Sequence, residues 1–94
     1  MKFTWNPDKA NKVARQHKVK FEKLTDVFDD PYCVDFTDDE HSNEFETRYA
    51  IIGKTAEYGL IYLVYAVVAV NEVRFITARK AENWMVRFYR ENQK

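Results

Sequence analysis

Charged side chains suited to phosphate chemistry stand on two alternating segments of the chain. Glu46 and Arg48 are separated by one residue, and Arg74 lies in a second alternating segment. Successive side chains of a strand point to opposite faces, so Glu46 and Arg48 share a face, and Arg74 joins them if both segments lie in one sheet. A carboxylate can accept the proton of a ribose 2′-hydroxyl while guanidinium groups stabilise the charged phosphorane. The pattern suits phosphodiester cleavage without metal; the alternative is a surface ion pair that contributes little.

Arg79 stands where the alternating residues 72–77 pass into residues with helical periodicity. Thr77 is a plausible cap for that helix, because its hydroxyl can accept a free amide of the first turn. A guanidinium beside such a helix start forms a small anion-binding arrangement. We expect Arg79, Lys9 and the phenol of Tyr89 to converge on the rim of the same sheet face. The alternative is that Arg74 and Arg79 are solvated surface charges.

Other kinds of site are weakly supported. The sequence holds no glycine-rich phosphate loop, no histidines paired at helical spacing and no serine or cysteine nucleophile signature. His41 stands among acidic residues, but the spacing matches no known cation cage, and a solvated loop is the better interpretation. Cys33 is the only cysteine, which excludes an internal disulfide and a cysteine-built zinc site. We therefore expect no metal and no cofactor.

Size and charge set further bounds. The 94 residues are enough for a single domain spanning 1–94, and the formal net charge is zero. Any nucleic-acid role must then depend on a local cluster rather than on a global field. The longest apolar run, residues 60–70, is about half of a membrane span, and no signal segment opens the chain. These features favour a cytoplasmic protein without membrane contact.

The periodicity predicts the elements that must position these side chains. Asn6-Pro7-Asp8 has the pattern of a capped helix start, and residues 60–68 resemble a central strand that is buried on both faces. In the last helix, Ala81, Trp84, Met85 and Phe88 are expected to form the buried stripe. The predicted helices are 7–18, 20–29 and 79–92, and the predicted strands are 2–5, 32–36, 45–53, 59–68 and 71–78. This order, strand-helix-helix, then an antiparallel meander and a C-terminal helix, indicates an α+β domain.

Several short motifs together resemble the BrnT family of toxins. Glu46-Thr47-Arg48 with Gly53 is similar to the family's Glu-x-Arg strand that leads to a glycine. Residues 74–81, Arg-Phe-Ile-Thr-Ala-Arg-Lys-Ala, are similar to its Arg-Ile-Ile-Ser-Ala-Arg-x-Ala signature, and Tyr89 matches a tyrosine that follows. The opening of the chain also resembles the family through Trp5, Lys9, Asn11 or Lys12, His17, Phe21 and Phe28.

The resemblance implies a RelE-like fold and a metal-independent endoribonuclease toxin with RNA as its substrate. It implies a BrnA-like antitoxin as partner, in a toxin–antitoxin heterotetramer that contacts DNA only through the antitoxin. The residues expected to act are Glu46 as base, Arg48, Arg74 and Arg79 as phosphate binders, Tyr89 as a positioning or proton-donating group, and Lys9 and Lys80 as substrate binders.

The chain departs from the family pattern at Asn6, where aspartate is usual, and at Lys18, which replaces the glycine after the histidine. Met85 occupies the place where the family commonly carries a glutamate. The alternative function is therefore a non-catalytic module that binds its antitoxin and contributes to operator repression.

Overall fold

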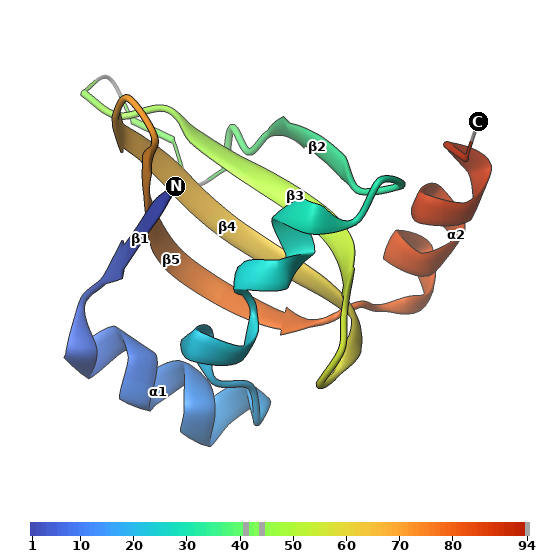
Figure 1. Ribbon diagram of the computed structural model, residues 1–94, viewed down its shortest axis with the longest axis horizontal. Helices are drawn as coiled ribbons and strands as arrows, with labels where there is room; N and C mark the ends of the chain where they lie inside the picture. The colour runs from blue at the N-terminus through green and yellow to red at the C-terminus, as the bar shows by residue number, and fades with distance from the viewer. Residues whose placement is uncertain (41, 44, 94) are drawn as a thin grey trace.

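The described part of the chain, residues 1–40, 42–43 and 45–93, forms a five-stranded sheet with helices packed against it in a computed structural model (Figure 1). The sheet order is β1-β5-β4-β3-β2. The pairs β5-β4, β4-β3 and β3-β2 are antiparallel, and the edge strand β1 runs parallel to β5. The strands are β1 (Lys2–Trp5), β2 (Val34–Thr37), β3 (Arg48–Thr55), β4 (Gly59–Ala69) and β5 (Glu72–Lys80). The predicted α+β class with an antiparallel meander is confirmed.

Helix α1 (Pro7–His17) begins as its sequence predicts. The Oδ1 atom of Asn6 accepts hydrogen bonds from the amides of Asp8 and Lys9, at 2.8 and 3.2 Å. The helix ends at Lys18, whose φ of 60° is left-handed. A side chain there is strained, because its Cβ crowds the following carbonyl oxygen. This is the position at which the family resemblance expects glycine.

Residues 20–29 do not form the α-helix that the sequence predicts. They form two short 3₁₀ helices, η1 (Phe21–Lys23) and η2 (Thr25–Asp29). Phe21, Leu24 and Val27 are fully buried and spaced by three residues, which is one turn of a 3₁₀ helix. Lys20 precedes η1 and has no side-chain oxygen to cap a longer helix. The prediction failed because positions spaced by three also satisfy the wider α-helical pattern.

The main core lies between η1, η2 and one face of the sheet. Phe75 of β5 packs edge-on against Phe21 and stacks with Trp5, with ring centroids 5.6 Å apart in both pairs. Gly53 of β3 admits η2 at close range, because a Cβ at this position would stand 2.5 Å from Cγ2 of Val27. The approach of η2 to β3 therefore requires glycine.

The last strand and the last helix differ from their predicted bounds. β5 continues to Lys80, and the amide of Ala81 still donates to the carbonyl of Leu60 at 3.0 Å. Helix α2 (Asn83–Glu91) therefore begins after Glu82, and Thr77 is a strand residue rather than a helix cap. Pairing with β4 outweighed the local helical pattern. The prediction that Arg79 stands at a helix start is wrong.

Helix α2 packs on the sheet face opposite to η1 and η2. Its Phe88 meets Phe36 of β2 at 5.7 Å between ring centroids, and its Trp84 meets Tyr62 of β4 at 6.3 Å. Met85 is fully buried, whereas Trp84 and Phe88 keep exposed surface, so the predicted stripe is only partly buried. Glu82 donates its amide to Sδ of Met85 at 3.3 Å. The methionine thus fills the capping-box position that a glutamate normally occupies.

The start of β3 and the far end of β4 also differ from the prediction. β3 begins at Arg48 rather than at residue 45, because the backbones of Asn43 and Glu46 bond to each other instead of to a neighbouring strand. In β4 the predicted two-sided burial holds as far as Ala66, whereas Val67 and Val68 are exposed in the projecting β4–β5 hairpin. Among the described residues, no helix is long and apolar enough to cross a membrane.

Candidate functional site

Glu46, Arg48 and Arg74 meet on one face of the sheet as expected, although Glu46 lies before β3 rather than within it. Oε1 of Glu46 accepts from Nε of Arg48 at 3.0 Å, and its Oε2 accepts from Nη2 of Arg74 at 2.6 Å. Ala66 of β4 pairs with Arg48 on one side and with Arg74 on the other. Its small side chain leaves space in which both guanidinium groups can reach Glu46. The side chains are 21% to 39% exposed, so the cluster is open to a ligand.

The hydrogen bond from Arg48, and after it the one from Arg74, holds the pKa of the Glu46 carboxyl below its usual value of 4.5. Glu46 is therefore ionised at neutral pH and can accept a proton. Its low basicity limits its strength as a general base. The cluster combines both guanidinium charges with a single carboxylate, which leaves a net positive charge for an anionic ligand.

The turn before β3 fixes Glu46 and Arg48. Oδ1 of Asn43 accepts from the amide of Glu46 at 2.9 Å, and Oγ of Ser42 accepts from the amide of Arg48 at 2.9 Å. Ser42 also donates to the carbonyl of Asp38 at 2.7 Å. Short polar side chains thus give these backbone groups the partners that a sheet neighbour would otherwise supply.

Arg79 lies on the same sheet face as Arg74, but not in contact with Glu46. Val64 of β4 pairs with Thr77, whereas the adjacent Tyr65 pairs with Phe75, so β5 carries Ile76 as an extra residue. Such a bulge reverses the alternation that follows it. Arg74 pairs with Ala66 and Arg79 with Tyr62. Four positions along β4 separate these partners, a distance of about 13 Å.

Arg79 has its own set of neighbours. Its guanidinium carbon lies 5.4 Å from the centroid of the Tyr62 ring, and its Nη1 is 3.3 Å from Oε1 of Glu82. Glu82 also accepts from Nε1 of Trp84 at 3.2 Å. The Nε atom of Arg79 is buried and has no hydrogen-bond partner among the described residues. Glu82 thus orients both the arginine and the tryptophan.

Lys9 reaches the Arg48 side of this face. A cavity of about 260 Å³ is lined by Lys9, Lys12, Val13, Gln16, Arg48, Ile76 and Thr77. Lys12 was not predicted as a site residue, although its position three residues after Lys9 places both lysines on neighbouring turns of α1. The cavity joins lysines of α1 to Arg48 of β3, which makes it a cationic recess beside the Glu46 cluster.

Tyr89 and Lys80 lie apart from the cluster. Tyr89 donates its hydroxyl to Oδ2 of Asp30 at 2.7 Å, and the same oxygen accepts from the amide of Lys54 at 2.8 Å. Lys54 is six positions along β3 from Arg48, or about 20 Å. Burial, and after it the bond to Asp30, raises the pKa of Tyr89 to about 12. The amine of Lys80 lies 5.9 Å from the centroid of the Tyr58 ring.

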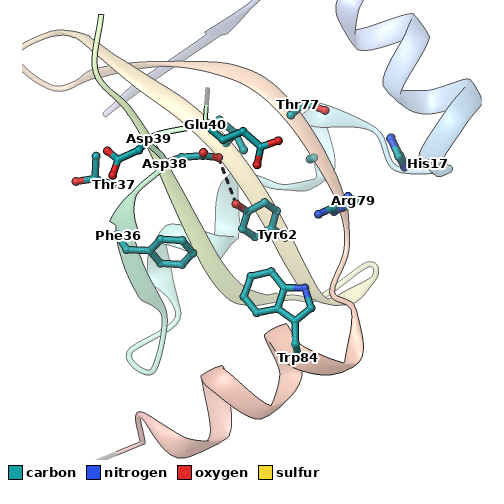
Figure 2. Close-up of a pocket in the computed structure, with 12 residues that line it drawn as sticks. His17, Phe36, Thr37, Asp38, Asp39, Glu40, Tyr62, Thr77, Arg79 and Trp84 are labelled. Carbon is teal, nitrogen blue, oxygen red and sulfur yellow. Dashed lines mark hydrogen bonds between the residues drawn. The ribbon is translucent and has the colours of Figure 1, made fainter. Parts of the chain in front are cut away.

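A second cavity, of about 460 Å³, opens beside Arg79 (Figure 2). Its lining comes from α1, the end of β2 with the loop after it, β4, β5 and α2. Tyr62 donates to Oδ2 of Asp38 at 3.3 Å across this space. Burial, and after it the charge of Asp38, raises the pKa of Tyr62 to about 12, so the phenol stays protonated. Sequence patterns did not identify this cavity, because its residues come from five separate segments.

In residues 1–40, 42–43 and 45–93, no group of three or more His, Cys, Asp or Glu side chains has the arrangement of a metal site. His41, which stands in sequence between the acidic residues 38–40 and Glu44, lies outside the described residues, as does Glu44.

Two comparisons with known proteins match this chain to BrnT ribonuclease toxins. A family model described as "Ribonuclease toxin, BrnT, of type II toxin-antitoxin system" matches residues 5–83. The fold is similar to the crystal structure of the Brucella abortus ribonuclease toxin BrnT, with a TM-score of 0.69 and 20% sequence identity. That match covers 88% of this chain and 99% of the Brucella chain. No curated protein matches the chain.

Proposed function

The chain belongs to the BrnT family of ribonuclease toxins of type II toxin–antitoxin systems, and we propose that it cleaves RNA at the sheet face that carries Glu46, Arg48 and Arg74. The observation that carries the proposal is the single carboxylate held between two guanidinium groups, at 3.0 and 2.6 Å, with a lysine-lined recess beside it. This arrangement can hold a phosphodiester and take up a proton without any further group.

The proposed reaction is an attack of the ribose 2′-oxygen on the adjacent phosphorus. Glu46 accepts the 2′-hydroxyl proton, the new O2′–P bond forms, and the bond to the 5′-oxygen breaks to leave a 2′,3′-cyclic phosphate. Arg48 and Arg74 stabilise the charge that gathers on the phosphorane oxygens. The departing 5′-oxygen takes a proton from the ammonium group of Lys9 or from water.

The other expected residues contribute to binding in this proposal. Arg79 lies about 13 Å from Arg74, so it contacts the RNA beyond the cleaved phosphate. Lys80 pairs with Ile61 and so projects from the opposite face of β5, beside Tyr58; it would bind RNA only where the RNA passes around the end of that strand. Tyr89 acts through Asp30 by holding α2 against the sheet, rather than by reaching the substrate.

The partner follows from the family. We propose a BrnA-like antitoxin that covers the basic face, in a heterotetramer that contacts DNA through the antitoxin alone. The element order of strand, helix, meander and helix supports a RelE-like architecture, and a cytoplasmic location fits an RNA substrate. An antitoxin laid across Arg48 and Arg74 would exclude RNA from the cluster, which accounts for neutralisation.

A second candidate is a non-catalytic antitoxin-binding module. The observation in its favour is that Glu46 already engages both arginines, as a structural ion pair would, and its lowered pKa weakens it as a base.

Induction of the chain in a bacterial host separates the two candidates. The ribonuclease arrests growth and degrades RNA, and its purified form cleaves RNA equally well in the presence of EDTA. Arg74→Ala should lower cleavage about a hundredfold or more, whereas Arg87→Ala, which removes an exposed arginine from α2, should have no effect. Cleavage that needs added divalent metal, or that survives Arg74→Ala, contradicts the proposal. Binding of the antitoxin without any cleavage supports the module.

A further inference from the structure

The cavity beside Arg79 has a lining that suits a nucleobase rather than a phosphate. We propose that it binds a guanine base of the RNA, an inference that rests on the proposed function and defines the preferred substrate. A volume of about 460 Å³ falls in the range of about 300–1,000 Å³ that is typical of small-ligand sites. The carboxylates of Asp38, Asp39 and Glu40 on its rim would repel a phosphate.

Aromatic side chains form one wall of the cavity. Trp84 is 49% exposed and lies 6.3 Å from Tyr62 between ring centroids, at an interplanar angle of 63°. Phe36 also lies 6.3 Å from Tyr62. Unpaired RNA bases are commonly held by stacking on aromatic rings or on the plane of an arginine. Figure 2 shows Trp84 projecting from α2 toward Tyr62, with open space on the side of Arg79.

The acidic rim selects among the bases. In Figure 2 the carboxylate of Glu40 lies above Tyr62 and turns toward the side of Thr77 and Arg79, whereas Asp39 lies toward Thr37. A carboxylate only accepts hydrogen bonds, and guanine alone offers two adjacent donors, N1–H and the 2-amino group. Adenine and cytosine place a ring acceptor beside their amino group, and uracil flanks its single N–H with carbonyl oxygens. Arg79 faces the same space and can donate to O6 of guanine.

The base pocket joins the phosphate site. Thr77 lines both the cavity beside Arg79 and the recess that holds Lys9 and Arg48. Thr77 pairs with Val64 of β4, which lies between Tyr62 and Ala66 in the strand. A nucleotide can therefore place its base against Tyr62 and extend its phosphate toward Arg48 along one sheet face. This continuity makes the pocket part of the substrate path.

Binding of mononucleotides tests the pocket without any need for catalysis. Calorimetric titration would use guanosine 3′-monophosphate and its adenosine, cytidine and uridine counterparts. The unmodified chain should prefer guanosine by about tenfold or more. Glu40→Gln should remove most of that preference, because an amide cannot accept at both of its positions. Glu57→Gln, which removes an exposed carboxylate from the β3–β4 turn, should retain it. Equal affinity for all four nucleotides, or an unchanged preference in Glu40→Gln, overturns the proposal.

Mapping of cleavage sites separates this inference from the proposed function. If the chain cleaves RNA with no preference for guanine at a fixed position beside the cut, the ribonuclease proposal is supported and the guanine pocket is contradicted. If the chain cleaves no RNA but still prefers guanosine 3′-monophosphate, the guanine pocket is supported and the catalytic proposal is contradicted. Trp84→Ala should weaken the binding of all four nucleotides by a similar factor of about five to a hundred. An unchanged affinity would exclude stacking on this ring.

Discussion

Arg74 and Arg79 project from the same face of the sheet, which a regular strand would not allow for residues an odd number of positions apart. The bulge at Ile76 makes this possible. Phe75 and Thr77 pair with the adjacent residues Tyr65 and Val64 of β4, so Ile76 is an extra residue in β5. Since their partners on β4 are Ala66 and Tyr62, one arginine serves the Glu46 cluster and the other serves the aromatic cavity.

The separation of the arginines predicts different kinetic effects. Arg74→Ala should lower kcat, because Arg74 bonds the group that would take the proton. Arg79→Ala should mainly raise KM, because under the proposed function Arg79 would contact RNA beyond the cleaved bond. Steady-state cleavage of a short RNA measures both constants. Equal loss of kcat in both variants would contradict the separation, and Arg87→Ala is the matched control.

Acid should weaken the cluster that joins the β3 and β5 strands. The pKa of Glu46 is lowered in the folded chain by its hydrogen bonds to Arg48 and Arg74, so the unfolded chain binds its proton more tightly. The stabilisation is thus present above the unfolded value of about 4.5 and is lost as the pH falls through the lower folded value. Thermal melts between pH 3 and pH 7 should show a smaller acid-side decrease in Glu46→Gln. Identical pH profiles would show that the ion pairs contribute nothing to stability.

Tyr89→Phe should change stability and leave cleavage unchanged. The substitution removes the hydroxyl that donates to Asp30, and a hydrogen bond to a charged acceptor is worth about 1.5–3 kcal/mol; partial exposure reduces this to about 1 kcal/mol here. Denaturant unfolding and an RNA cleavage assay measure the two effects. A large decrease in kcat with unchanged stability would indicate that Tyr89 acts in catalysis.

Lys18→Gly should stabilise the chain. Lys18 closes α1 with a φ of 60°, and glycine adopts this conformation without the steric cost of about 1 kcal/mol that other residues bear. For a domain of this size the gain corresponds to an increase in Tm of about 4–8 °C. Lys20→Gly is the control: Lys20 has a φ of −106°, so the substitution there relieves no strain and should lower Tm.

The sequence predicted what depends on short-range alternation and failed where pairing between strands decides. Arg48 and Arg74 could be placed on one face because both lie on strands and pair with Ala66, whereas Glu46 precedes β3 and reaches them from outside the strand. The bulge at Ile76 has no local signal, since it exists only relative to β4. The end of β5 could not be placed because the pairing extends as far as the bond from the amide of Ala81 to Leu60, and residues 77–81 alone do not indicate that distant partner. The cavity of Tyr62, Glu40 and Trp84 arises only when distant segments meet.

The attachment of α2 has a consequence for how long the aromatic cavity persists. Three side-chain contacts and the buried side chain of Met85 hold the helix in place. The contacts are the hydrogen bond from Tyr89 to Asp30 and the ring contacts of Phe88 with Phe36 and of Trp84 with Tyr62. A short terminal helix held by so few side chains opens at a lower free energy than the central strands. Its amides should exchange with deuterium early, while those of β4 stay protected. Each such opening withdraws Trp84 and abolishes the cavity, yet leaves the arginines around Glu46 in place. The proposed base pocket would therefore be absent for part of the time during which the proposed cleavage site stays formed.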